Sequence, residues 1–208
     1  MTNASERYIE AVRYVGDLYD FLNSRFFTGA LSKPVITLQA DESSSKARAL
    51  GWFVRKEIWK ESSEDEGATE INLTAQYLDR PFEEIAATLL HEMCHQYAYA
   101  EKVQDCSRSG TYHNKLFKRI AETHGLKVEC VKTIGWSHTE LTDESRETLK
   151  AFESSHKLIY RLPTIKGARV KTSSTRKYIC PVCGQSVRAT KVVNIICADC
   201  NEPMQEED

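Results

Sequence analysis

The sequence predicts an α+β fold in which helices pack on a small antiparallel sheet, followed by a small zinc-ribbon β module. Apolar residues recur at helical spacing in the first thirty residues and again near residues 82–101. Short strand-like runs lie between these two segments. Near the C-terminus, four cysteines form two C-x₂-C pairs, which is the spacing of a ribbon-type zinc site.

The composition places the chain among ordinary globular proteins. It has 208 residues, of which 41% are hydrophobic and 28% charged, and this excludes a disordered or collagen-like chain. No apolar run approaches the roughly 18 residues that a membrane-spanning helix needs. Residues 1–10 contain no apolar segment typical of a secretory signal, so we expect a cytoplasmic protein, with nucleoid or nuclear association as a further option. In a reducing compartment, seven cysteines favour thiols or metal ligands over disulfides.

The first half of the chain predicts a helix followed by strands. Residues 6–27 carry an apolar stripe at spacings of three, four and seven, and Gly29 and Pro34 mark its end. Strands are expected over 35–39, 50–54 and 69–73. The acidic, serine-containing segment 61–67 predicts an exposed hairpin loop between the last two strands.

The second half predicts three more helices. One begins after Pro81, where two glutamates favour the positive end of the helix dipole, and continues to about Glu101. Polar residues over 102–111 predict a loop. A helix is expected over 114–124, stopped by Gly125, and another over 142–158.

The helix near residue 90 carries the pattern H-E-x-x-H as His91, Glu92 and His95. Residues four apart lie on one face of a helix, about 6 Å apart along its axis, so the two imidazoles can bind one zinc ion. Glu92 follows His91 on the helix, so it lies beside the metal and not on it. It can act as general base toward a water molecule that zinc acidifies. The alternative is a pair of histidines that serve only core packing.

A catalytic zinc site normally needs a third protein ligand, which the motif does not identify. Position 101, which a metzincin would fill with histidine, is Glu101, so that motif is absent. We prefer His113, because it follows the 102–111 loop and opens the next predicted helix. The alternatives are His124, His138, His156 and carboxylates such as Glu122.

Three segments of the chain carry a resemblance to a known family. The motif helix Ile85–Tyr97, the preceding run Leu73–Leu78 and the later His113–Phe117 resemble the SprT-like zinc metallopeptidases, which include the Spartan proteases. Residues 22–31 are similar to the opening helix of that family, and the likeness extends over about residues 5–155. The resemblance implies a compact zincin-like fold and His113, followed by Phe117, as third ligand. It also implies digestion of proteins on DNA, as in DNA–protein crosslink repair, although this chain lacks anything like the long C-terminal region of Spartan.

The C-terminal cysteines form the pattern C-x₂-C-x₁₃-C-x₂-C through Cys180, Cys183, Cys197 and Cys200. Four protein ligands leave no open position, so we expect a structural zinc that supplies most of the folding energy of this small unit. The 13-residue spacer predicts a hairpin of two short strands. A redox pair of C-x-x-C motifs is the alternative, but no thioredoxin-like pattern surrounds it. Cys94 is expected to face the core, and Cys106 and Cys130 receive no role.

Basic residues are concentrated between residues 157 and 198, which hold nine Lys or Arg and no acidic residue. Residues 1–156 carry a net charge of −6 and the last 52 residues +4. This asymmetry predicts either a polyanion contact or a solvated basic linker. We expect sequence-independent binding to single- or double-stranded DNA, and the candidate residues are Lys166, Arg169, Lys171, Arg176, Lys177, Arg188 and Lys191.

These observations predict a metallopeptidase domain over 5–158, a basic linker over 159–177 and a zinc ribbon over 178–203. We expect an endopeptidase that holds two zinc ions and cleaves DNA-associated proteins. No membrane partner is expected, and the oligomeric state is left open. A nucleic-acid- or protein-binding adaptor with a latent zinc site is the first alternative. A hydrolase of small amides is the second, because the zinc chemistry is the same.

Overall fold

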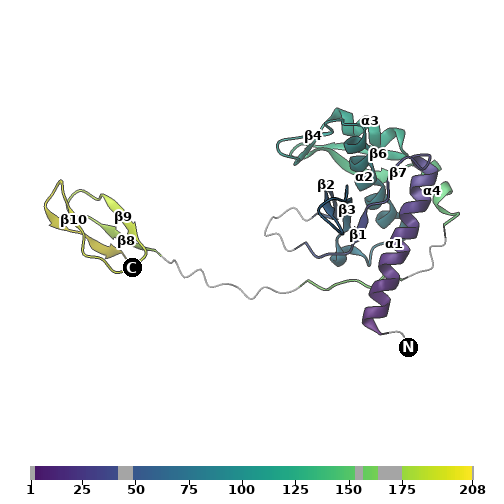
Figure 1. Cartoon of the computed structure of the whole chain (residues 1–208). Coiled ribbons are helices and arrows are strands. Elements are labelled where there is room, and N and C mark those ends of the chain that lie inside the picture. The colour runs from purple at the N-terminus through teal and green to yellow at the C-terminus, as the bar shows by residue number, and fades with distance from the viewer. Residues whose placement is uncertain (1–2, 42–48, 153–156, 164–174, 208) are drawn as a thin grey trace. The chain divides into compact units, whose positions relative to one another are not determined.

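The computed structural model describes residues 3–41, 49–152, 157–163 and 175–207. The chain forms two compact units, Met1–Pro163 and Thr164–Asp208 (Figure 1). None of the described helices combines the length and hydrophobicity that crossing a lipid bilayer requires.

The first unit opens with helix α1, Ala4–Phe26. Asn3 caps its N-terminus by accepting from the backbone N–H of Glu6, and the Glu6 carboxylate accepts from the backbone N–H of Asn3 in return. The buried face of α1 includes Val15, Leu18 and Leu22. This amphipathic helix therefore covers one side of the core of the first unit, as the sequence predicts (Figure 1).

A three-stranded sheet follows, in the order β1-β3-β2, with the bounds Val35–Thr37 for β1, Gly51–Trp59 for β2 and Ala68–Leu73 for β3. Strands β2 and β3 form the expected antiparallel hairpin around the 61–67 loop. Strand β1 pairs with β3 in parallel, so the sheet is mixed where the sequence predicts an antiparallel one. Strand β3 is central, and Ile71–Leu73 are buried.

Helix α2, Phe82–Ala100, forms the centre of the first unit. The short 3₁₀ helix η1, Ala75–Tyr77, precedes it. Most of α2 is buried, because the first sheet contacts one side of it and the second sheet and α3 contact another. A helix enclosed in this way holds its side chains in fixed rotamers, which is what a metal site requires.

The second sheet has the order β4-β5-β7-β6, and none of its strands was expected. Its strands are Cys106–Ser107, Tyr112–His113, Leu126–Val131 and Gly135–Leu141, for β4 to β7 in turn. The predicted 102–111 loop contains β4 and the turn of a hairpin, and the strands β5, β6 and β7 were missed. Helix α3, Lys115–Thr123, connects β5 to β6.

Two expectations about the end of the first unit are corrected. Helix α4, Asp143–Leu149, begins after the N-cap Thr142 but is much shorter than the predicted 142–158. Residues 153–156 lie outside the described residues. The sequence also favours a surface position for His124 at the end of its helix; it does end α3, but it is buried, and its ring stacks on Phe27 at 4.3 Å between centroids.

The second unit is a small β module built around four cysteines. Its strands are Arg176–Ile179, Ser186–Ala189, Ile196–Cys197, Glu202–Pro203 and Gln205–Glu207, for β8 to β12 in turn. The predicted hairpin in the spacer is wrong. Strand β9 pairs back with β8, and β10 pairs forward with β11, so each half of the spacer folds beside its own cysteine pair. With four α-helices and small sheets among the described residues, the α+β class is confirmed.

Candidate metal centre

Three imidazoles meet at the middle of the first unit. His91 and His95 lie one turn apart on α2, and His113 lies on β5. Their Nε2 atoms are 3.2 Å apart for His91 and His95, 3.3 Å for His91 and His113, and 3.0 Å for His95 and His113. The three nitrogens therefore face one common point.

Strand β5 brings His113 to the other two histidines. His113 pairs with Cys106 on β4 and, in parallel, with Gly135 on β7. Gly135 has a φ of +76°, and a Cβ there would lie 2.1 Å from the carbonyl oxygen of His113, so only glycine fits this approach. The expectation that His113 opens the third helix is corrected, because Asn114 is the N-cap of α3.

Each of the three rings has a partner for its second nitrogen. The Nδ1 of His91 lies 2.9 Å from Thr139 Oγ1, that of His95 lies 2.5 Å from Asp105 Oδ2, and that of His113 lies 3.3 Å from the carbonyl oxygen of Ile134. A carboxylate or a carbonyl oxygen accepts a hydrogen bond from Nδ1–H, which keeps the proton on Nδ1 and leaves the lone pair on Nε2 free for a metal.

The donor set fits zinc. Zn–N bonds are about 2.0–2.1 Å long, so tetrahedral geometry separates two ligand nitrogens by about 3.3–3.4 Å. The three Nε2 distances lie close to that value. Phe117 closes the apolar side, with its ring 4.5–4.7 Å from each imidazole centroid. Three nitrogen ligands leave the fourth position of a tetrahedral ion open.

Glu92 lies beside this centre and is only 6% exposed. Burial raises the pKa of its carboxyl to about 7, and His95, Arg55 and the backbone N–H of Phe53 oppose that rise. A carboxyl with a pKa near neutrality can exchange protons with a bound substrate at physiological pH.

The charges of the three histidines are set by their surroundings. Burial lowers the pKa of His113 to about 4 and that of His91 well below its ordinary value. Burial also lowers the pKa of His95, but its hydrogen bond to Asp105 outweighs this and raises the pKa to about 9. In the metal-free protein at neutral pH, His95 is therefore the ring that carries the positive charge.

A cleft of about 950 Å³ runs past the three histidines. Strand β2 lines one side, and Ser137–Leu141 of β7 line another. His138 lies in this lining, where it contacts Glu140 at 3.4 Å and is too far along β7 to complete the trio. Tyr112, a candidate oxyanion donor by its position next to His113, is not part of the lining, because its ring packs against Arg108.

The comparison with family models decides the classification. The model described as the SprT-like family matches residues 15–135, more than half of the chain. The chain belongs to the SprT-like family. The match contains the three histidines and Glu92, and membership supports a metallopeptidase-type function at the level of the family. No curated protein and no solved structure matches the chain.

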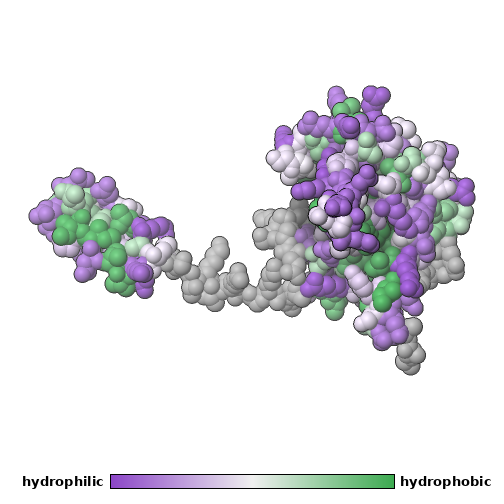
Figure 2. All heavy atoms as spheres, viewed as in Figure 1, coloured by the Kyte–Doolittle hydropathy of each residue, from purple (hydrophilic) through white to green (hydrophobic). Residues whose placement is uncertain are grey.

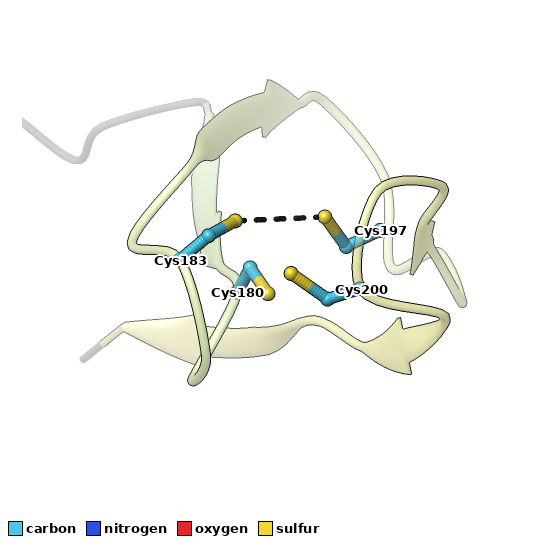
Figure 3. A group of neighbouring side chains, drawn as sticks. All are labelled: Cys180, Cys183, Cys197 and Cys200. Atoms are coloured by element: carbon cyan, nitrogen blue, oxygen red, sulfur yellow. Dashed lines mark hydrogen bonds between the residues drawn. The ribbon is translucent and has the colours of Figure 1, made fainter.

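Outside the family match, the second unit brings all four ribbon cysteines together (Figure 3). Their sulfur atoms lie within 4.8 Å of one another, and Cys183 and Cys197 are 3.7 Å apart. Tetrahedral Zn–S bonds of about 2.3 Å separate sulfurs by about 3.8 Å, so this cluster also fits zinc. Backbone N–H groups of Cys183 and Val182 lower the pKa of Cys180 to about 7, which favours the thiolate that binds metal.

The other candidate ligands do not reach the trio. His124 packs against Phe27 and Tyr97, and Glu122 lies on the exposed side of α3, 3.5 Å from Lys118. His156 lies outside the described residues. Cys94 is fully buried, as expected.

Sequence reasoning missed three residues around the centre, namely Arg55, Asp105 and Thr139. Asp105 is completely buried between His95 and Arg55, and Thr139 contacts His91. No spacing or motif marks these residues, because they come from a strand, a loop and a second strand that meet only in the folded chain.

The basic residues predicted to contact DNA fall into three groups. Lys166, Arg169 and Lys171 lie outside the described residues. Arg176 and Lys177 lie on β8, where they pair with Glu206 at 3.1 Å and Glu207 at 2.5 Å on the neighbouring strand β12. Arg188 and Lys191 are exposed and form no salt bridge among the described residues.

Proposed function

We propose that the chain is a zinc-dependent endopeptidase in which His91, His95 and His113 hold the metal and Glu92 is the general base. The convergence of three Nε2 atoms beside the buried Glu92 carboxyl carries this proposal. A zinc ion held there supplies Lewis acidity, which acidifies a water molecule and polarises a substrate carbonyl.

Glu92 performs the proton transfers of the proposed reaction. Its carboxylate accepts a proton from the attacking water and then returns it to the nitrogen of the leaving amine. The backbone N–H of Phe53 orients one face of the carboxylate, and α2 fixes its Cα beside two of the ligands. A structural zinc site has no use for a buried glutamate placed in this way.

The shape of the cleft supports a polypeptide substrate. Strand β2 pairs with β3 alone in the described part of the chain, and it lines the cleft through Gly51–Phe53 and Arg55. An extended peptide can pair with such an open strand edge through backbone hydrogen bonds. This arrangement favours peptide-bond hydrolysis within a chain over hydrolysis of a small amide.

Glu92→Gln tests the assignment of the base. The amide keeps the shape of the side chain but cannot accept the proton, so protein cleavage should fall by about 10²–10⁴-fold while both metals stay bound. Glu122→Gln is the control, because Glu122 lies on the exposed side of α3 and does not line the cleft. Cleavage retained by a metal-loaded Glu92→Gln protein would refute the mechanism and favour the adaptor alternative.

We further propose that the basic second unit and linker hold the enzyme on DNA, which would select DNA-associated proteins as substrates. Arg188 and Lys191 support this proposal most directly, since neither pairs with an acidic residue in the described structure, whereas Arg176 and Lys177 do. Contacts of this kind release counterions and weaken with salt.

A salt series with single- and double-stranded DNA tests this second proposal. Replacing both Arg188 and Lys191 by Gln removes two phosphate contacts. The plot of log affinity against log salt should therefore become shallower, with the magnitude of its slope smaller by about 2. Lys60→Gln, an exposed change in the first unit, is the control. An unchanged slope, or no affinity of the full chain at low salt, would exclude this role.

A further inference from the structure

We propose that Arg55 and Asp105 form a positioning pair that fixes His95 as the strongest metal ligand of the trio. The inference rests on the proposed metal site, and it assigns a role to two residues that lie behind the ligands and do not touch the metal position. Asp105 acts on His95 directly, and Arg55 acts through Asp105.

The two oxygens of Asp105 are used separately. Oδ2 lies 2.5 Å from His95 Nδ1, and Oδ1 lies 2.7 Å from Nη1 of Arg55. The Asp105 side chain has no exposed surface, so water does not compete for either oxygen. With Nδ1–H donated to a carboxylate, the His95 ring is held in the tautomer whose Nε2 faces the other two ligands.

Arg55 completes the pair from strand β2. Its second terminal nitrogen, Nη2, lies 3.3 Å from His95 Nδ1, so the guanidinium contacts the carboxylate and the edge of the imidazole at the same time. An ionised carboxylate buried without a counter-charge is costly, and Arg55 is a permanent cation in contact with this one. The planar fork of arginine reaches two partners at once, which the single ammonium of lysine does not.

Asp105 also connects to the third ligand through the main chain. Its carbonyl oxygen accepts from the backbone N–H of Asn114, and the Asn114 side chain donates to the carbonyl of Gln104. Asn114 directly follows His113. The residue that orients His95 therefore also fixes the backbone beside His113, so one buried residue couples two ligands.

The three ligands differ in the chemistry of their partners. His91 contacts a hydroxyl and His113 a backbone carbonyl, whereas His95 alone contacts a carboxylate. An anionic partner makes the imidazole a better electron donor to the metal than a neutral one does. We therefore expect Asp105 to contribute more to zinc affinity than Thr139.

The test measures metal affinity of the full-length protein by chelator competition. Asp105→Asn and Arg55→Gln should each weaken zinc binding at the histidine site by about 10–100-fold. Cobalt binding separates the two sites, because only the cysteine cluster gives thiolate-to-cobalt charge-transfer bands. Those bands should stay unchanged in both variants.

Glu70→Gln is the matched control for Asp105→Asn. Glu70 is also a buried carboxylate, 5% exposed, and it accepts from the indole N–H of Trp59, away from the histidines. Glu70→Gln should lower stability without changing zinc affinity. Equal losses of zinc affinity in Glu70→Gln and Asp105→Asn would show a general structural effect and overturn the proposal.

The double variant provides a second test that does not depend on a single substitution. If the two residues act as one unit, Arg55→Gln combined with Asp105→Asn should lose no more affinity than the weaker-binding single variant. Additive losses would overturn the pairing. Wild-type affinity in both single variants would overturn the positioning role. If His113→Ala still lost the metal in that case, the proposed function would stand.

Discussion

His95 carries a proton where the proposed metal must bind, and this has a measurable consequence. Its hydrogen bond to Asp105 holds the pKa near 9, although burial alone would lower it. His91 and His113 are neutral at physiological pH, because burial lowers their pKa values. Zinc binding must therefore displace one proton from the trio, and that proton comes from His95.

Zinc affinity of the histidine site should rise with pH. Below pH 9 the folded protein binds a proton that zinc displaces, so affinity should increase by about tenfold per pH unit between pH 7 and pH 9 and then level off. Chelator competition across this range, in a full-length Cys180→Ser background, measures the slope. A flat profile would contradict the protonation state assigned to His95.

At the scale of elements, the close contact between β2 and α2 determines where Glu92 lies. Gly51 begins β2 opposite Glu92, and a Cβ at Gly51 would lie 2.8 Å from the carbonyl oxygen of Asn72, 3.2 Å from Thr88 Cγ2 and 3.4 Å from Glu92 Cγ. The strand also supplies the Phe53 N–H to the Glu92 carboxyl. A small displacement of β2 therefore alters the base as well as the packing.

Gly51→Ala should destabilise the first unit by about 1–3 kcal/mol, because the added methyl group meets backbone that cannot yield easily. Cleavage should also decrease, since the Phe53–Glu92 contact shifts. Gly16→Ala is the control: its Cβ meets nothing closer than 3.8 Å, and alanine favours the helix by about 1 kcal/mol. Urea unfolding separates the two, and equal stability of Gly51→Ala and wild type would contradict this packing account.

The elements that sequence reasoning predicted are those with a strong local pattern. α1 and α2 carry apolar stripes, and the H-E-x-x-H spacing follows from the helical repeat alone. β6 was missed although Leu126, Val128 and Cys130 alternate with Lys127 and Glu129, so the pattern of this strand was present in the sequence. Arg55 and Asp105 could not be predicted, because 50 positions separate them and only tertiary packing brings them together.

At the scale of the whole molecule, the two units are stabilised in different ways. The first has an apolar core that runs from α1 through β3 and α2 to α3, with Tyr19 and Phe117 among its largest buried side chains. The second has few buried apolar side chains among its described residues and exposes Val182, Val192 and Ile196. Figure 2 shows such hydrophobic residues gathered on the surface of this unit. Its cysteine cluster must therefore supply much of its stability.

Metal removal should affect the two units unequally. A strong chelator should unfold the second unit, because no comparable apolar core remains, while the first keeps its helical structure. Amide hydrogen exchange, with and without chelator, should show lost protection over the described residues 175–207 and retained protection in α1 and α2. Retained protection in both units would show that the ribbon folds without metal.

The metal content of the full-length chain tests the histidine centre most directly. Two zinc equivalents are predicted for the wild type, and one for Cys180→Ser combined with Cys183→Ser. Adding His113→Ala to that variant should remove the remaining equivalent, since two histidines alone hold zinc weakly. Retention of one full equivalent after the loss of His113, with the fold intact, would contradict the three-histidine site.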